Sequence, residues 1–155
     1  MALAACAHLG GLRPRYGPIA GSVSIELEAQ PDSVIAAVRR QVDSAGFAVR
    51  LIDPAEGYLE TAWFDLAARR SVSDRNRDLD QTVKLRFFSD PTAGHTRLAA
   101  ECVRRIAFDP SEPERDLERM VPDSTPGRML LDSVLAKLKA EYPMPAAAPP
   151  EHARG

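Results

Sequence analysis

The side chains that could carry out covalent or metal chemistry are few and scattered along the chain. His8 and His152 lie near the two ends and His95 at an expected hairpin tip, so no two histidines have a spacing that suits a metal ion. Cys102 falls on the apolar side of an expected strand, where burial raises the pKa of a thiol and makes it inert. We therefore expect no catalytic residues, no metal site and no cofactor, and an enzyme is the least favoured class.

Cys6 is the residue with a specific predicted chemistry. The run Leu3-Ala4-Ala5-Cys6 resembles the lipobox of bacterial lipoproteins, in which the cysteine is lipidated after the signal is cleaved. A complete signal has a basic start and an apolar stretch of about 7–15 residues, whereas five residues precede Cys6. Either the true start lies upstream or the motif is an accident in a cytosolic leader. We favour the lipoprotein, because small residues before a terminal cysteine are what a truncated signal leaves. By resemblance to Gram-negative lipoproteins, Ala7 permits sorting to the outer membrane.

Composition indicates one globular domain between two less ordered ends. The 155 residues are 45% hydrophobic and 27% charged, which is an ordinary globular balance, and the net charge of −2 gives no overall attraction to nucleic acid. No apolar run approaches the roughly 18 residues that span a bilayer. We expect a signal remnant and flexible tether at 1–20, one domain at 21–142, and a disordered Pro/Ala-rich tail at 143–155.

Hydrophobic periodicity predicts the fold class. Strict alternation indicates a strand over 22–29, and apolar residues at helical spacing indicate helices that begin at Pro31 and Pro126. Two hairpins separate the helices, each with an Asp-Pro-x-x-Gly loop. The order β-α-β-β-β-β-α predicts an α+β, helix-grip-like fold with an antiparallel five-stranded sheet and both helices on one face.

The two loops predict a register for the hairpins. A four-residue loop places Asp90 opposite His95, and therefore Leu85 opposite Ala100. The same loop in the first hairpin pairs Val49 with Ala62 and Phe47 with Phe64. In that register Glu60 points toward the helices, which is the one polar exception, and a slip of one residue would reverse the faces.

The sheet face without helices is the candidate interaction surface. Its apolar members either are exposed and mark a contact with a protein or lipid, or are covered by the loops at 65–81 or 109–127. Basic and aromatic groups on a sheet can stack nucleic-acid bases, but Glu26, Glu28 and Glu101 share this face, so we favour a salt-bridged surface and no nucleic acid. The predicted interaction residues are Arg50, Ile52, Leu59, Thr61, Trp63, Lys84, Arg86 and Phe88.

A local motif carries a family resemblance. The run Gly57-Tyr58-Leu59-Glu60-Thr61-Ala62-Trp63 resembles the Gly-x-x-x-Thr-x-Trp stretch of the BamC family of outer-membrane assembly lipoproteins. The likeness spans roughly residues 21–142, although this chain has room for one helix-grip unit where that family has two. The resemblance implies a non-enzymatic accessory lipoprotein that binds other envelope proteins, and it assigns no binding residues.

These observations favour a lipid-anchored module of the cell envelope, held at the periplasmic side of the outer membrane through Cys6. Its partner is an envelope protein, bound by the open sheet face or by strand addition at an edge. The alternative is a carrier of small apolar ligands, with a cavity between helix and sheet.

Overall fold

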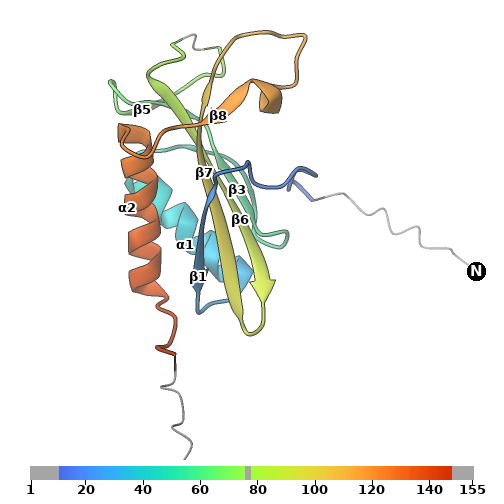
Figure 1. The fold of residues 1–155 in the computed structure, drawn as a ribbon, viewed down its shortest axis with the longest axis vertical. Coiled ribbons are helices and arrows are strands. Elements are labelled where there is room, and N and C mark those ends of the chain that lie inside the picture. Colours follow the sequence, from blue (N-terminus) through green and yellow to red (C-terminus); the bar gives the residue numbers. More distant parts are fainter. Residues whose placement is uncertain (1–10, 76–77, 148–155) are drawn as a thin grey trace, which may run out of the picture.

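The computed structural model describes residues 11–75 and 78–147, so Cys6, His8 and His152 lie outside the described residues. As predicted, the fold is α+β, with two helices on an antiparallel sheet (Figure 1). Neither helix in the described ranges is long and apolar enough to cross a membrane. The elements are β1 (Val23–Leu27), α1 (Pro31–Ser44), β2 (Val49–Asp53), β3 (Tyr58–Thr61), β4 (Trp63–Asp65), β5 (Arg70–Val72), β6 (Thr82–Thr92), β7 (His95–Arg105), a 3-10 helix (Glu114–Leu117), β8 (Glu118–Met120) and α2 (Pro126–Glu141).

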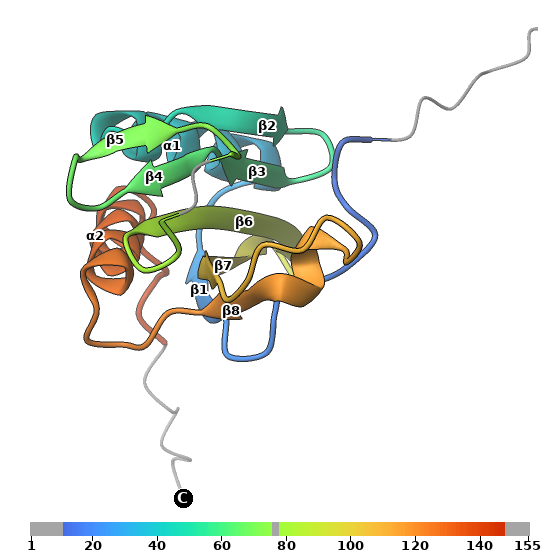
Figure 2. The same cartoon turned by 90° about the horizontal axis from the view of Figure 1, so that it is seen from above.

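The sheet contains the five predicted strands, one of which is divided in two, and two short additional strands. Its main order is β2-β3-β6-β7-β1, and every pairing is antiparallel. The predicted strand 58–64 is broken at Ala62 into β3 and β4, and β4 also pairs with β5, which lies in the loop that follows it. The loop after β7 supplies β8, which continues beyond β1 along the same edge of β7 (Figure 2). The sheet therefore has eight strands.

Both helices form where the periodicity predicts them. Proline occupies the first turn of each, where its missing N–H has no partner to lose. The buried face of α1 includes Val34, Val38 and Val42, and that of α2 includes Leu131 and Leu138. These side chains pack on Leu59, Phe64, Leu85, Phe87, Leu98, Ala100 and Cys102 of the sheet to form the main core.

The register of the β6–β7 hairpin differs from the prediction by two residues. Thr92 pairs with His95 across a two-residue turn, and Leu85 lies opposite Cys102 rather than Ala100. Gly94 has φ +81°, a conformation that suits a tight turn, so Pro91 and Thr92 continue the strand. Because side chains alternate with period two, this slip keeps the same residues on the core face.

The first hairpin follows the predicted register near its turn and then departs from it. Leu51 pairs with Glu60 as expected, but a bulge at Arg50 places Val49 opposite Thr61 rather than Ala62. The prediction for Ile52 and Leu59 was wrong, because both pack in the core beneath the helices. Glu60 correspondingly points to the opposite face. Phe47 and Phe64, which the predicted register places opposite each other, are not paired as strand residues, but their rings stack with centroids 4.2 Å apart.

The chain before β1 also differs from the expected tether. Residues 11–20 belong to the described structure, and part of this stretch packs on the domain. The backbone N–H of Leu12 donates to the carboxylate of Asp53 at 2.7 Å, and Arg13 forms an ion pair with Asp90 at 2.8 Å. The folded domain therefore includes residues ahead of the predicted boundary at 21, at least as far back as Leu12.

Substitutions of two glycines at positive φ, Gly57 and Gly94, test how closely the first hairpin packs against β6. A Cβ added to Gly57 would lie 2.1 Å from the backbone oxygen of Ser89, whereas one added to Gly94 meets nothing within 4 Å. We expect Gly94→Ala to cost about 1–2 kcal/mol for the left-handed backbone and Gly57→Ala to cost clearly more. Urea unfolding of both variants measures this difference, and equal losses would contradict the packing of β3 against β6.

Candidate functional site

The sheet face opposite the helices, here called the second face, is covered rather than open. Lys84 is 0% exposed, Trp63 1% and Arg86 2%. The covering chain is residues 107–120, here called the cover segment, together with residues 11–17. Of the two alternatives left by the sequence, the structure therefore shows the covered face, with residues from the 109–127 loop folded over it.

Five of the eight predicted interaction residues lie on the second face. Lys84, Arg86 and Phe88 alternate along β6. Arg50 forms an ion pair with Glu60, which also pairs with Lys84, and the ammonium group of Lys84 lies over the ring of Trp63. Thr61 lies at the break between β3 and β4, where its hydroxyl accepts the N–H of Leu85 at 3.0 Å. Ile52 and Leu59, as described above, face the helices.

The break at Ala62 brings Trp63 onto this face. Glu60 pairs with Arg86 and Phe64 pairs with Val83, so four steps along β3–β4 match three steps along β6. One extra residue in a strand shifts the alternation that follows it. Trp63 therefore lies on the same side as Glu60, and Phe64 enters the core.

Glu60 is the centre of a buried network of charges. One oxygen of its carboxylate accepts hydrogen bonds from the Nε of Arg86 and the hydroxyl of Tyr58, both at 2.7 Å. The other lies 2.9 Å from Arg50 and 3.5 Å from the Nζ of Lys84. Burial alone would raise the pKa of Glu60, but the charges of Lys84 and Arg86 and the hydrogen bonds from Arg86 and Tyr58 outweigh it and lower the pKa. Glu60 is therefore a carboxylate at neutral pH.

Arg86 links this network to the cover segment. Its guanidinium makes a two-pronged contact with Glu118, one branch of which joins Nη2 to Oε1 at 2.7 Å. Glu118 is fully buried at the start of β8. Bidentate guanidinium–carboxylate pairs are strong and geometrically specific, so this contact fixes β8 on the edge of the sheet.

Glu114 attaches the same segment at a second point. Its Oε1 accepts from the Nζ of Lys84 at 3.2 Å, the Nη2 of Arg105 at 3.0 Å and the indole N–H of Trp63 at 3.2 Å. The Arg105 guanidinium lies between two rings, 4.3 Å from the centroid of Trp63 and 4.8 Å from that of Phe108. Burial opposes ionisation, but Lys84 and Arg105 hold the pKa of Glu114 at about 2.

Glu101 differs from the other buried carboxylates. Its Oε2 lies 2.6 Å from Arg115, but its fully buried Oε1 has no hydrogen-bond partner among the described residues. Burial, which the charge of Arg115 only partly offsets, raises the pKa of Glu101. Arg115 also donates to the carbonyl oxygen of Gly17 and lies 4.6 Å from the ring centroid of Tyr16, so it joins the cover segment to the N-terminal segment.

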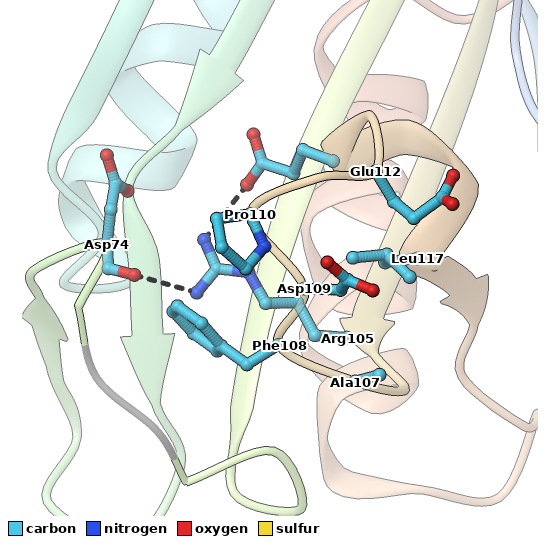
Figure 3. A pocket seen from close by; sticks show the side chains of 9 residues that line it. Asp74, Arg105, Ala107, Phe108, Asp109, Pro110, Glu112 and Leu117 are labelled. Atoms are coloured by element: carbon cyan, nitrogen blue, oxygen red, sulfur yellow. Dashed lines mark hydrogen bonds and ion pairs between the residues drawn. The ribbon is translucent and has the colours of Figure 1, made fainter.

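A pocket of about 210 Å³ opens where the cover segment meets the loop after β5 (Figure 3). Arg105 lies in it beside Phe108, with dashed contacts to the backbone oxygen of Asp74 and to Glu114. Four carboxylates and one guanidinium line the pocket, alongside an apolar wall. The lining residues are Asp74, Arg105, Ala107, Phe108, Asp109, Pro110, Glu112, Glu114 and Leu117.

The charged groups of the second face are engaged mainly with one another. Its buried carboxylates are matched by guanidinium and ammonium groups, and within residues 11–75 and 78–147 no cluster of His, Cys, Asp or Glu could hold a metal ion. Burial raises the pKa of the Cys102 thiol to about 12. The thiol is therefore protonated at neutral pH, when it is a poor nucleophile.

The sequence alone did not indicate the pocket. From the sequence, residues 109–127 are expected only as a loop that covers the sheet face in one of the two alternatives. The spacing of Glu114 and Glu118 was the available signal, because two acidic residues four apart can reach neighbouring cations on one face. No protein-family model matches the chain, and the search of curated proteins finds no match either.

The two atypical carboxylates predict opposite pH responses. The pKa of Glu114 falls from 4.5 to about 2 on folding, so its contribution to stability is present above pH 4.5 and is lost as the pH falls toward 2. The pKa of Glu101 is raised, so its ionisation destabilises the fold as the pH rises above 4.5. We compare the free energy of unfolding of each variant with that of the unmodified chain at the same pH. For Glu114→Gln we expect a larger loss at pH 7 than at pH 3. For Glu101→Gln we expect the difference to become more favourable to the variant as the pH rises from 3 to 7. Urea unfolding across this range measures both differences, and pH-independent differences would contradict the two assignments.

Proposed function

We propose that this protein is a non-enzymatic interaction module of the cell envelope, anchored by a lipid on Cys6 at the periplasmic side of the outer membrane. The anchor rests on the Leu-Ala-Ala-Cys motif, which lies outside the described residues. The function as a module rests on the domain itself, and a role accessory to outer-membrane assembly rests on the BamC-like motif.

One structural observation supports a binding role most directly. The side chains of the apolar core pack against one another, whereas Phe108, which lines the pocket, is 38% exposed. An exposed aromatic ring at a concave site with polar groups around it is typical of protein contacts. This combination favours recognition of a partner at the surface.

The docked N-terminal segment limits how far such an anchor can lie from the domain. Gly11 packs against the β2–β3 turn, since a Cβ added to it would lie 2.4 Å from the Cγ of Glu56 and 3.0 Å from the Oδ2 of Asp53. Five residue steps separate Cys6 from Gly11, which a fully extended chain covers in about 17 Å. A lipid on Cys6 would therefore keep the β2–β3 turn close to the membrane.

The alternative of an apolar-ligand carrier has no comparable support. The centre of the space between the helices and the sheet is filled by side chains that include the fully buried Val34, Ile35, Leu85, Phe87 and Leu138, and the pockets that touch α2 lie at its two ends. A carrier needs an apolar cavity at that place. The interaction module is therefore the function we retain.

Metabolic labelling tests the anchor. The gene with its natural upstream region is expressed in a Gram-negative host supplied with an alkyne fatty acid, alongside Cys6→Ser and, as the matched control, Cys102→Ala. We expect the unmodified chain and Cys102→Ala to carry label and fractionate with the outer membrane, and Cys6→Ser to carry none, because only a lipobox cysteine is acylated. An unlabelled native protein, or label that persists on Cys6→Ser, would overturn the anchor.

A further inference from the structure

We propose that the pocket beside Phe108 binds a lysine or arginine side chain of a protein partner. This inference rests on the proposed interaction function and adds the chemistry of the partner. The pocket lies beside the buried charge network, and the side chains of that network form part of its wall without filling it.

The charges that line the pocket favour a cation. Glu114 is matched by Lys84 and Arg105, and Asp74 lies 3.9 Å from Arg50. Among the described residues, no basic side chain forms an ion pair with Asp109 or Glu112. Two hydrogen bonds from Ser111, at 2.6 and 2.9 Å, lower the pKa of Asp109 and keep it ionised. The pocket therefore has unbalanced negative charge at its rim.

Arg105, the one cation among the described residues that line the pocket, is already engaged. Arg105 is stacked between two rings and donates to the backbone oxygen of Asp74 at 2.9 Å and to Glu114 at 3.0 Å. These contacts fix its plane as part of the wall. Asp109 and Glu112, the two lining carboxylates that no described basic side chain pairs with, therefore favour a cationic ligand over an anionic one.

The apolar wall suits the aliphatic part of a long basic side chain. Ala107, Phe108, Pro110 and Leu117 line the pocket together with the carboxylates. Lysine and arginine bury their methylene groups along apolar surface while their charged ends stay near polar groups. A basic side chain could place its stem on Phe108 and its charge beside Asp109 or Glu112.

The size of the pocket favours a single side chain over a larger ligand. Its volume of about 210 Å³ lies below the roughly 300–1,000 Å³ of sites for drug-sized molecules. It corresponds to about seven waters at ~30 Å³ each. One long side chain from a protein surface fits this volume, and the exposed ring of Phe108 supplies apolar area beside it.

Amide chemical shifts of the full-length chain test this binding site. The probes are Nα-acetyl-arginine amide and Nα-acetyl-lysine amide, with Nα-acetyl-glutamine amide as the neutral control. We expect the basic probes to give saturable shifts at Ala107, Phe108 and Leu117 that weaken with added salt, and the neutral probe to give none. Shifts of equal size with the neutral probe, or shifts located elsewhere, would overturn the proposal.

A matched pair of variants separates this site from general charge attraction. Asp109→Asn with Glu112→Gln removes two rim charges while leaving the contacts of Glu114 in place, and we expect it to weaken binding of the basic probes about three- to tenfold. Glu28→Gln with Asp116→Asn changes the net charge equally at exposed positions that do not line the pocket, and should leave binding unchanged. Equal losses in both variants would contradict the site.

Other outcomes identify a different occupant or a failure elsewhere. Shifts at the pocket that appear when the protein alone is concentrated would assign the site to a second copy and overturn the proposal. The titration needs no membrane, so failure to bind the probes rejects the partner chemistry, whereas failure of fatty-acid labelling rejects only the anchor.

Discussion

The guanidinium of Arg86 lies between the carboxylates of Glu60 and Glu118, with almost no contact with water. Removing one member of a buried ion pair typically costs about 3–5 kcal/mol, because the remaining charge is left without a partner. Arg86 on the central strand β6 therefore requires β8, which carries Glu118, to lie on the sheet. With β8 in place, Glu114 reaches Lys84 and Arg105, and the pocket beside Phe108 takes its shape.

The fold class was predictable because each helix and long strand has a repeating apolar pattern of its own. Val34, Val38 and Val42 indicate one helix face. The alternation in β6 and β7 predicts the correct core-facing residues even though the register differs by two residues. The first hairpin was less predictable. Its bulge at Arg50 and the break at Ala62 each change the alternation, so Leu59 and Ile52 entered the core against expectation.

The candidate site was predictable only in part. The sequence placed Lys84 and Arg86 on the second face correctly, since β6 alternates regularly, whereas Trp63 lies there because of the break at Ala62. It could not show which chain segment covers them, because the ion pairs of Glu114 and Glu118 join residues about 30 positions apart. The spacing of Glu114 and Glu118 indicates that the two carboxylates can share a face, but no local pattern identifies the cations that they meet. The same reasoning explains why the docking of Tyr16 and Arg13 was missed.

Hydrogen exchange in Glu118→Gln tests most directly whether the Arg86 pair holds the cover segment in place. The N–H of Ile106 donates to Leu117 and that of Val121 to Cys102, whereas the N–H of Ala62 donates to Ala48 and that of Phe47 to Val42, away from this segment. We expect exchange at Ile106 and Val121 to accelerate at least about tenfold, equivalent to ~1.4 kcal/mol, and far more than at Ala62 and Phe47. Equal acceleration at all four amides, or none at Ile106 and Val121, would contradict this account.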